Sequence, residues 1–432
     1  MNVLILGSGG REHALAWKIS QSKELDKLFC MSGNPGTASI ATNLSGDTKY
    51  FAQIETQIRS NNINMLVVGP EVPLVDGIRD YFGAVMPELM VIGPDKKGAA
   101  LEGSKDFAKE FMIRHNIPTA RYKSFTSDTI HDAYRFLGTL KPPYVLKADG
   151  LAAGKGVVIT DDLKDAEREL SEMFEGKFDD AGHKVVIEEF LSGIELSVFI
   201  LTDGVHYMIL PEAKDYKRIG EHDTGLNTGG MGSVSPVPFA DKSFMGKVEE
   251  RIIKPTIAGL RSEGIDYCGF IFIGLMNCGG DPYVIEYNVR MGDPETESVM
   301  RRIDSDLLCH LAAAAKGELD KETIRISSSS AVTVVAVSGG YPEHYIKGFQ
   351  ISGLPDCSKY SDTKSLPVVF HAGTAMKDGK TVTSGGRVLA VTAMGDNIFE
   401  AGESAYKALS EINFENIYYR KDITDDLKSL CK

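Results

Sequence analysis

A loop rich in glycine and lysine, Lys147–Val157, stands between two short apolar runs, Pro143–Leu146 and Val157–Ile159. Short apolar runs separated by turn residues predict two strands joined by a loop. Glycines let backbone amides approach a ligand closely, and lysines bring positive charge to the same place. The loop has three glycines and two lysines, at Gly150, Gly154, Gly156, Lys147 and Lys155. It therefore indicates a binding site for a polyphosphate.

The spacing of these glycines differs from that of a Walker A loop. That motif has four residues between its first glycine and Gly-Lys, followed by Ser or Thr and then a helix. Here Gly156 stands where the hydroxyl residue would be, and a β-branched strand follows. The layout is closer to a flap that closes over phosphates, with Lys147 on the strand that leads into it. A plain glycine hairpin with solvated lysines is the alternative.

The length and composition are those of a globular protein with several domains. The chain has 432 residues, 43% of them hydrophobic and 25% charged. That is enough for roughly two to four domains with sizeable cores. The net charge of −13 argues against a broad nucleic-acid surface, so any anion site must be local. No apolar run approaches the roughly 18 residues of a membrane span. We therefore expect neither a nucleic-acid partner nor a membrane partner.

The cysteines are scattered and form no C-x-x-C pair. There are six of them, at Cys30, Cys268, Cys278, Cys309, Cys357 and Cys431. This distribution favours reduced thiols over a disulfide framework or a zinc site. The pattern predicts a cytoplasmic protein.

Residues 1–101 have the pattern of a small α/β domain. A buried-type strand, Val3–Leu6, leads through the turn Gly7–Gly10 into a predicted helix, Arg11–Ser20. The first amides of such a helix form an anion site. A dinucleotide fingerprint would need glycine where the chain has Glu12, and the following strand ends without an acidic residue for a ribose. A single phosphate is therefore the better candidate ligand.

The central part of the chain carries features that suit a nucleotide. Ser104 predicts the start of a helix, Lys105–His115, with Lys105 either solvated or aimed inward. A predicted strand then gives way to Glu188–Leu191, where exposed backbone and carboxylates would hydrogen-bond a nucleoside. Glu195 follows just before the next strand. A turn at the edge of a sheet, with no binding role, is equally compatible with this pattern.

Periodicity disappears between Asp215 and Pro236. A segment this long without a regular pattern, inside an otherwise regular chain, is typical of a functional lid. A disordered surface loop is the alternative reading.

Two predicted strands, Gly269–Met276 and Tyr283–Asn288, precede a cluster of polar residues. Glu286 and Asn288 are two positions apart, so both side chains leave one face of the second strand. Arg290, Asp293 and Glu295 follow. A carboxylate and an amide oxygen on one face suit Mg²⁺, which keeps its other positions for water and substrate phosphate. Two solvent-facing residues on an edge strand are the alternative.

The tail from Ile326 is β-rich and ends in a predicted helix, Asn397–Ile412. Its chemistry is limited to His371 and Arg387, for which a packing role is the simpler expectation.

Many of these stretches form a series of motifs in a fixed order. They are Gly7–His13, Val68–Glu71, Leu101–Lys105, Lys147–Val157, Ile187–Leu191, Asp223–Gly232, Glu286–Asn288, Gly292–Thr296, Gly339–Pro342 and His371–Gly373. Together they closely resemble the glycinamide ribonucleotide synthetase (phosphoribosylamine–glycine ligase) family of ATP-grasp enzymes in de novo purine synthesis. The resemblance covers nearly the whole chain.

The resemblance implies an α/β and α+β multidomain fold. The expected parts are an N-terminal Rossmann-like domain, an ATP-grasp domain of two α+β subdomains, and a small β-rich C-terminal domain. Their expected boundaries are 1–101, 102–325 and 326–432, with the flap subdomain at about 120–190. A monomer is expected, with a dimer as the alternative.

The resemblance also implies ligands and residue roles. ATP, glycine and 5-phosphoribosylamine would be substrates, with Mg²⁺ or Mn²⁺ held by Glu286 and Asn288. The residues implied around ATP are Lys105, Lys147, Gly154, Lys155, Gly156, Glu188, Glu189, Phe190, Leu191 and Glu195. Those implied around the other substrates are Gly9, Gly10, Asp223, Arg290, Gly292 and Asp293. Arg290, Lys155 and Asp223 would be catalytic, with Asp223 and Arg290 bracketing glycine.

The implied reaction passes through glycyl phosphate, formed when the carboxylate of glycine attacks the γ-phosphate of ATP. The amine of phosphoribosylamine would then displace phosphate. Another ATP-grasp ligase or carboxylase with a different substrate is the nearer alternative, and a non-catalytic nucleotide-binding protein is the more distant one.

The chain departs from the family pattern at several positions. Many ATP-grasp relatives carry another carboxylate on the strand before the metal pair, but Gly269–Met276 has none. The sequence therefore leaves open whether the metal has a third protein ligand. Leu226 stands where proline is common, and Val289 and Met291 differ from the usual neighbours of the arginine. None of these changes removes a group with acid–base or ligand chemistry.

Overall fold

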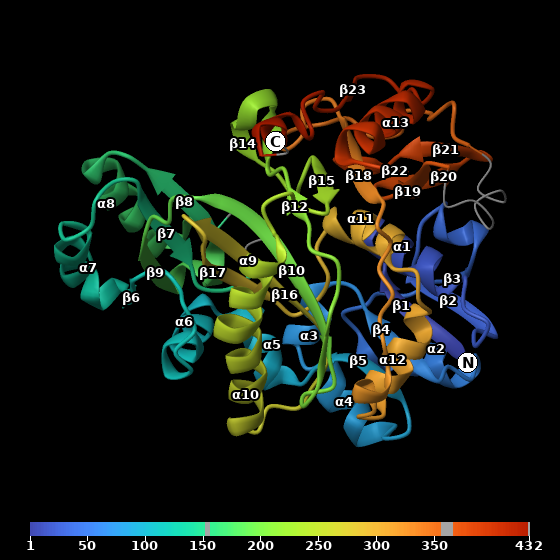
Figure 1. Ribbon diagram of the computed structural model, residues 1–432, viewed down its shortest axis with the longest axis horizontal. Coiled ribbons are helices and arrows are strands. Elements are labelled where there is room, and N and C mark those ends of the chain that lie inside the picture. The colour runs from blue at the N-terminus through green and yellow to red at the C-terminus, as the bar shows by residue number, and fades with distance from the viewer. Residues whose placement is uncertain (152–155, 356–365, 431–432) are drawn as a thin grey trace.

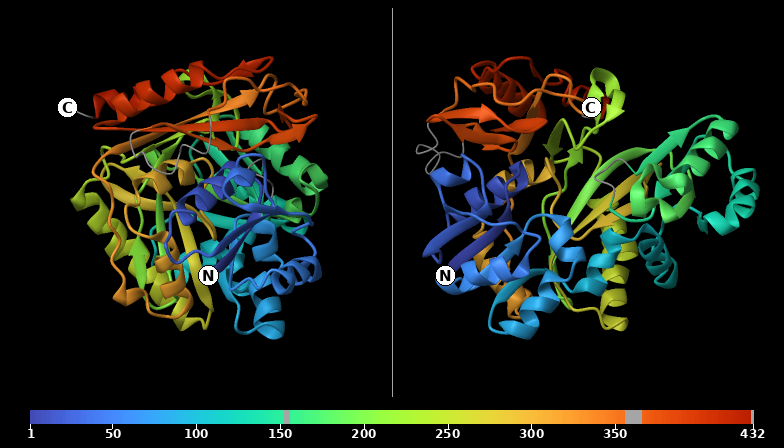
Figure 2. Two further views of the ribbon diagram at one scale, coloured as in Figure 1. Left: turned by 90° about the vertical axis from the view of Figure 1, so that its right-hand side faces the viewer. Right: turned by 180° about the vertical axis from the view of Figure 1, so that it is seen from behind.

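The computed structural model describes residues 1–151, 156–355 and 366–430. Two residues expected around ATP, Gly154 and Lys155, lie outside the described residues. The ribbon shows a main body, a β-rich layer formed by the carboxy-terminal part, and a smaller unit that projects from one side (Figures 1 and 2).

The amino-terminal part is a parallel sheet covered by helices. Its strands lie in the order β3-β2-β1-β4-β5, and every neighbouring pair is parallel. The elements are β1 (Asn2–Gly7), α1 (Gly10–Ile19), β2 (Lys27–Ser32), β3 (Thr42–Leu44), α2 (Phe51–Ser60), β4 (Met65–Val68), α3 (Glu71–Val75), α4 (Ile78–Val85), β5 (Met90–Pro94) and α5 (Lys96–Gly103). This arrangement confirms the predicted Rossmann-like fold.

The strand β1 shows why this sheet is buried on both faces. Val3 and Ile5 lie in one hydrophobic cluster, whereas Leu4 and Leu6 lie in another. Successive side chains of a strand point to opposite faces, so an unbroken apolar run supplies both clusters. The carboxyl end of β1 therefore meets α1 at a point fixed by packing from two sides.

The sheet continues beyond the amino-terminal part. β5 pairs antiparallel with β16 (Tyr267–Cys278) through Pro94 and Gly93, opposite Tyr267 and Cys268. β16 in turn pairs with β10 (Ile194–Thr202) and with β17 (Asp281–Asn288), and β10 pairs with β11 (Tyr207–Ile209). One nine-stranded sheet thus joins the amino-terminal part to the strands that carry the predicted metal ligands.

The projecting unit is a four-stranded antiparallel sheet with its own core. Its strand order is β6-β9-β7-β8. The elements are β6 (Tyr122–Thr126), α7 (Ile130–Leu137), β7 (Tyr144–Ala148), β8 (Val157–Thr160), α8 (Leu163–Glu172) and β9 (Lys184–Glu189). A separate hydrophobic cluster holds this sheet against α7 and α8. β7 and β8 pair as neighbours, which confirms the predicted strand–loop–strand unit.

Helices connect and cover these sheets. They are α6 (Lys105–Arg114), α9 (Lys242–Val248), α10 (Lys254–Ser262), α11 (Glu295–Arg302) and α12 (Leu307–Ala315). The predicted start of α6 is confirmed, because Ser104 Oγ accepts a hydrogen bond from the amide of Phe107 at 3.1 Å. Among the helices in the described ranges, none combines the length and the apolar character that a membrane crossing requires.

The carboxy-terminal layer is a six-stranded sheet backed by one long helix. Its order is β12-β15-β18-β22-β19, with β23 also paired with β18. The elements are β12 (Lys214–Asp215), β15 (Gly232–Ser235), β18 (Ser330–Ser338), β19 (Val368–His371), β22 (Arg387–Gly395), α13 (Ile398–Ser410) and β23 (Ile417–Tyr418). A separate two-stranded sheet is formed by β20 (Thr374–Lys377) and β21 (Lys380–Thr383). The prediction of a β-rich part is confirmed, although β23 follows the helix that was expected to be last.

The segment between Asp215 and Pro236 is more regular than its sequence indicates. β13 (Arg218–Gly220) and β14 (Thr224–Asn227) form a hairpin, and β15 joins the carboxy-terminal sheet. Strands of three or four residues are too short to show periodicity, which explains the different expectation.

Candidate active site

A buried carboxylate, Glu188, joins two lysines where the projecting unit meets the main body. Its Oε2 lies 3.0 Å from Nζ of Lys109 on α6, and its Oε1 lies 3.0 Å from Nζ of Lys147 on β7. Although burial favours the neutral acid, the two ammonium groups hold the pKa of Glu188 below its usual value. Burial lowers the pKa of Lys109 to about 8. Glu188 is therefore an ionised side chain that links α6 with β7 and β9. The sequence did not indicate that Lys109 belongs to this cluster.

The two lysines expected at the phosphates gather beside the expected metal ligand. Lys147 donates to the carbonyl oxygen of Ile285 at 3.3 Å, next to Glu286. Lys105 donates to the carbonyl oxygen of Gly150 at 2.9 Å. Burial lowers the pKa of Lys105, and the negative charge of Glu286 partly opposes this shift. Positive charge is thus concentrated at the root of the glycine-rich loop.

A small cavity lies between β10, β17 and the strand β12. Its charged lining consists of Glu195, Asp215, Lys217 and Glu286. Lys217 Nζ lies 2.6 Å from Glu195 Oε2. The charge of Lys217 lowers the pKa of Glu195 against the effect of burial. The cavity therefore brings two predicted residues, Glu195 and Glu286, together with a lysine that the sequence did not indicate.

The predicted metal pair has the expected placement. Glu286 and Asn288 are both partly exposed on β17, whereas Tyr287 between them is buried and hydrogen-bonded to Thr256. The pair therefore shares a face. The strand register places Gly274 of β16 opposite Glu286, so no side chain from β16 adds a ligand there. One carboxylate and one amide oxygen are hard donors that fit Mg²⁺.

Arg290 contacts two carboxylates from the amino-terminal part. Its Nη2 lies 2.9 Å from Glu102 Oε1, and its Nε lies 3.6 Å from Glu71 Oε2. Glu102 also accepts a hydrogen bond from the amide of Val289 at 2.8 Å. The expected glycine-binding arginine is thus oriented by acids of α3 and α5.

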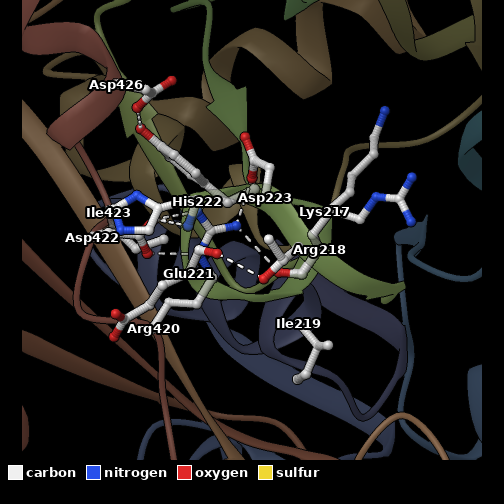
Figure 3. A network of polar contacts seen from close by, with 12 residues as sticks. Lys217, Arg218, Ile219, Glu221, His222, Asp223, Arg420, Asp422, Ile423 and Asp426 are labelled. Carbon is white, nitrogen blue, oxygen red and sulfur yellow. Dashed lines mark hydrogen bonds and ion pairs between the residues drawn. The ribbon is translucent and has the colours of Figure 1, made fainter.

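Asp223 lies at the tip of the β13–β14 hairpin, far along the chain from its partner (Figure 3). Its Oδ1 accepts a hydrogen bond from Nη1 of Arg420 at 2.6 Å. His222 and Asp223 both adopt positive φ angles, of 56° and 54°. No hydrogen bond or ion pair joins the side chains of Asp223 and Arg290, although both residues are described. The two residues expected to bracket glycine therefore contact different parts of the molecule.

Gly9 and Asp293 meet at a junction of the amino-terminal, central and carboxy-terminal parts. The amide of Gly9 donates to Glu12 Oε2 at 2.7 Å, and a Cβ on Gly9 would lie 3.4 Å from Asp293 Oδ2. Asp293 Oδ1 lies 2.9 Å from Nη1 of Arg387, which also donates to the carbonyl oxygen of Gly229 at 2.6 Å. The guanidinium of Arg387 therefore ties the segments at Gly229 and Asp293 to β22, which is a structural role made by hydrogen bonds and an ion pair.

The other predicted residues lie at the edges of these groups. Gly10 faces the buried side chain of Glu297, and Gly292 lies against Glu295. The carboxylate of Glu189 accepts a hydrogen bond from the amide of Arg121 at 2.8 Å, so it is already engaged. Phe190 is exposed, and Leu191 is half-buried. The carbonyl of Gly156 accepts a hydrogen bond from the amide of Ala148 at 2.8 Å, which closes the β7–β8 pair.

A flap-like antiparallel unit over a larger sheet, with lysines and an acid–amide pair between them, defines the class of protein. This is an ATP-grasp enzyme. Models of the N domain, the ATP-grasp (A) domain and the C domain of phosphoribosylglycinamide synthetase match residues 1–102, 103–296 and 331–426. The chain belongs to the phosphoribosylglycinamide synthetase family.

Named relatives agree with this assignment. The phosphoribosylamine–glycine ligase of Caldanaerobacter subterraneus is 43% identical over 424 residues, covering 98% of this chain and 99% of the relative. That of Pseudomonas aeruginosa is 45% identical over 427 residues, covering 98% and 97%. The crystal structure of the Thermotoga maritima phosphoribosylamine–glycine ligase has a TM-score of 0.85 and 36% identity, covering 98% of this chain and 100% of that chain.

A more distant structure shares the fold. The biotin carboxylase domain of the 2-oxoglutarate carboxylase from Hydrogenobacter thermophilus, in complex with MgADP and bicarbonate, has a TM-score of 0.72 at 14% identity, covering 100% of this chain and 98% of that chain. This likeness concerns the architecture alone.

Proposed function

We propose that the chain catalyses the ATP-dependent ligation of glycine to 5-phosphoribosylamine, giving glycinamide ribonucleotide, ADP and phosphate in purine (IMP) biosynthesis. The observation that carries the proposal is the match of the family's three domain models, in order, along the chain. ATP and Mg²⁺ are the cofactors of this fold, and Mn²⁺ is proposed as an alternative metal.

The nucleotide would lie between the projecting unit and the main body. Lys105 and Lys147 would contact its phosphates together with Gly154, Lys155 and Gly156 of the loop. The segment Glu188–Leu191 would surround the adenine through its backbone, and Glu195 would lie near the ribose. The buried lysine pairs of Glu188 support this role, because they fix the start of that segment.

Glu286 and Asn288 would hold the metal, which offsets the charge of the phosphates when it is bound. Arg290 and Asp223 would bind glycine, with Arg290 facing its carboxylate. Gly9 and Gly10 would bind phosphoribosylamine, and Gly292 and Asp293 would belong to the same substrate-binding surface. The contacts among Gly9, Asp293 and Arg387 support a single binding surface there.

The proposed chemistry has two steps. A carboxylate oxygen of glycine attacks the γ-phosphorus of ATP, a P–O bond forms, and ADP leaves, which gives glycyl phosphate. The amine nitrogen of phosphoribosylamine then attacks the carbonyl carbon, a C–N bond forms, phosphate leaves, and the nitrogen loses a proton. Lys105, Lys147 and Arg290 stabilise negative charge, and positioning supplies most of the rate. No side-chain nucleophile is required.

We propose that the domains span residues 1–101, 102–325 and 326–432, with the flap subdomain at about 120–190. A monomer is proposed as the working form. A cytoplasmic location stays a prediction that rests on the scattered cysteines.

Isotope transfer tests the mechanism. Glycine labelled with ¹⁸O in its carboxylate should deliver one label to inorganic phosphate for each amide formed, with ADP unlabelled. Label in AMP, or none in phosphate, would exclude glycyl phosphate. The rival substrates are tested separately, by comparing the stimulation of ADP formation by glycine, other amino acids and bicarbonate.

A further inference from the structure

A segment near the carboxy terminus, residues 418–426, holds the hairpin region 214–228 along much of its length (Figure 3). We call this segment the carboxy-terminal clasp. The hydroxyl of Tyr418 donates to the carbonyl oxygen of Ile219 at 3.0 Å. The amide of His222 donates to Asp422 Oδ2 at 2.7 Å. Asp426 Oδ2 lies 3.0 Å from Nζ of Lys214. The hairpin region is therefore held at its start, in its middle and near its tip.

Arg420 is the centre of the clasp. Its Nε and Nη2 donate to both oxygens of Asp422, at 2.8 and 2.7 Å. Its Nη1 donates to Asp223 Oδ1 at 2.6 Å and to the carbonyl oxygen of Arg218 at 3.2 Å. The side chain is 1% exposed. A planar guanidinium can satisfy these partners at once, whereas a lysine ammonium cannot reproduce the fork.

The clasp also fixes Tyr216, the residue before Lys217. Its hydroxyl donates to Asp426 Oδ1 at 2.7 Å and accepts from the amide of Thr424 at 3.0 Å. The guanidinium of Arg420 lies over its ring, 5.1 Å from the centroid. The ring itself is fully buried. Tyr216 lies in the short link between β12 and β13, and its neighbours Asp215 and Lys217 both line the cavity, whereas Tyr216 packs against the clasp.

Lys217 reaches the cavity that contains Glu195 and Glu286. Its ammonium is the positively charged group among acidic side chains there, 2.6 Å from Glu195. A displacement of about 1 Å near reacting groups can lower a rate about 100-fold. The position of Lys217 therefore depends on the contacts that the clasp makes with its neighbours Tyr216 and Arg218.

We propose that Arg420 is a positioning residue for the ligation reaction, holding residues 216–223 so that Lys217 stays in the cavity between Glu195 and Glu286. The proposal rests on the proposed function, because the reaction is what gives that cavity its role. Arg420 itself touches no substrate. It acts through Tyr216, Asp223 and the backbone of the hairpin.

Arg420→Lys tests the proposal, and Arg79→Lys is its matched control. Arg79 also donates to both oxygens of one aspartate, Asp266, at 2.9 and 3.1 Å, and to a carbonyl oxygen, but it lies on α4. We expect kcat/KM for glycine to fall at least about tenfold in Arg420→Lys. ADP binding should fall by a smaller factor, since Lys217 pairs with Glu195, which is expected near the ribose, but Lys105 and Lys147, expected at the phosphates, lie outside the hairpin. Hydrogen exchange of the amides of residues 216–223 should become faster.

Arg79→Lys should leave all three measurements near the wild-type values. Tyr216→Phe is a milder variant that keeps Arg420 and removes only the hydroxyl contacts. It should also speed the exchange of residues 216–223 and lower kcat/KM for glycine, each by a smaller factor than Arg420→Lys. This variant tests the proposal even if Arg420→Lys fails to fold.

Wild-type glycine kinetics in both folded variants would overturn the proposal, even with faster exchange, because the clasp would then be merely structural. An equal loss in Arg79→Lys would overturn it as well. Absence of glycine-dependent ADP formation in the wild type is a different failure, that of the proposed function. In that case the exchange of residues 216–223 still decides whether Arg420 holds the hairpin.

Discussion

Glu297 faces Gly10 so closely that a Cβ atom on Gly10 would lie 2.3 Å from Glu297 Oε1. The carboxyl group is fully buried on α11, and neither of its oxygens has a hydrogen-bond partner within the described ranges. Burial, reinforced by the charge of Asp293, raises the pKa of Glu297 well above its usual value. Contact between α1 and α11 thus depends on a residue without a side chain and on a carboxyl group that favours its neutral form.

Gly10→Ala should therefore be destabilising. The added methyl group would meet Glu297 in a closed space, and overpacking of this kind costs about 1–3 kcal/mol. Urea unfolding measures the loss. Gly83→Ala is the matched control, because Gly83 also lies in a helix and has nothing within 4 Å of its Cβ position. The control should be neutral or stabilised by up to about 1 kcal/mol. Equal stability of the two variants would contradict the close contact.

Glu297→Gln should stabilise the protein more at high pH than at low pH. The folded state holds the proton of Glu297 more tightly than the unfolded state, so the wild type loses stability as pH rises above the unfolded pKa of about 4.3. Glutamine cannot ionise and avoids this loss. The difference in melting temperature between variant and wild type should be larger at pH 8 than at pH 4.5. A difference independent of pH would show that Glu297 is not protonated in the folded state.

Glu286→Gln should leave the fold intact and lower turnover severely at ordinary Mg²⁺ concentrations. The side chain is partly exposed, so its replacement disturbs little packing. Residues that merely orient a metal ligand are worth about 10–100-fold in affinity or activity, and a charged ligand should be worth at least as much. Turnover as a function of Mg²⁺ concentration, with circular dichroism as the control for folding, tests this. Wild-type metal dependence would remove Glu286 from the proposed role.

Lys109→Met should cost about 3 kcal/mol of stability, because it leaves a buried carboxylate with one of its two partners missing. The control is Lys184→Met. Lys184 pairs with Asp106 at 2.6 Å, but its side chain is 42% exposed. An exposed pair contributes less than about 1 kcal/mol. Urea unfolding of both variants measures the contrast. Equal losses of stability in the two variants would mean that burial of the ion pairs of Glu188 does not increase their contribution to stability.

Local patterns were sufficient to predict much of the fold. The apolar runs on both sides of the glycine-rich loop predicted β7 and β8, and the spacing of Glu286 and Asn288 predicted that they share a face. Both inferences use residues that are neighbours in the sequence. The same holds for Ser104, whose capping bond reaches only three residues ahead.

Contacts between distant segments were not predictable in this way. Arg387 and Asp293 are 94 positions apart, and Arg420 and Asp223 are 197 apart. Lys109 and Lys217 carry no motif of their own, so only the folded chain reveals their carboxylate partners. The sequence did not predict the hairpin at 218–227, because strands of three and four residues contain too few alternations to be recognised.

The pairing of β5 with β16 makes the family's first domain boundary a poor place to divide the molecule. A fragment that began at residue 102 would leave the backbone of Tyr267 and Cys268 without the partners that Gly93 and Pro94 provide. It would also uncover apolar side chains of β10 and β16, which share one cluster with Leu4 and Leu6. An unpaired strand edge beside exposed apolar surface is a template for aggregation. We therefore expect the fragment that begins at residue 102 to aggregate when it is expressed alone. Co-expression with a fragment of residues 1–101 should restore soluble protein, because that fragment covers the exposed edge.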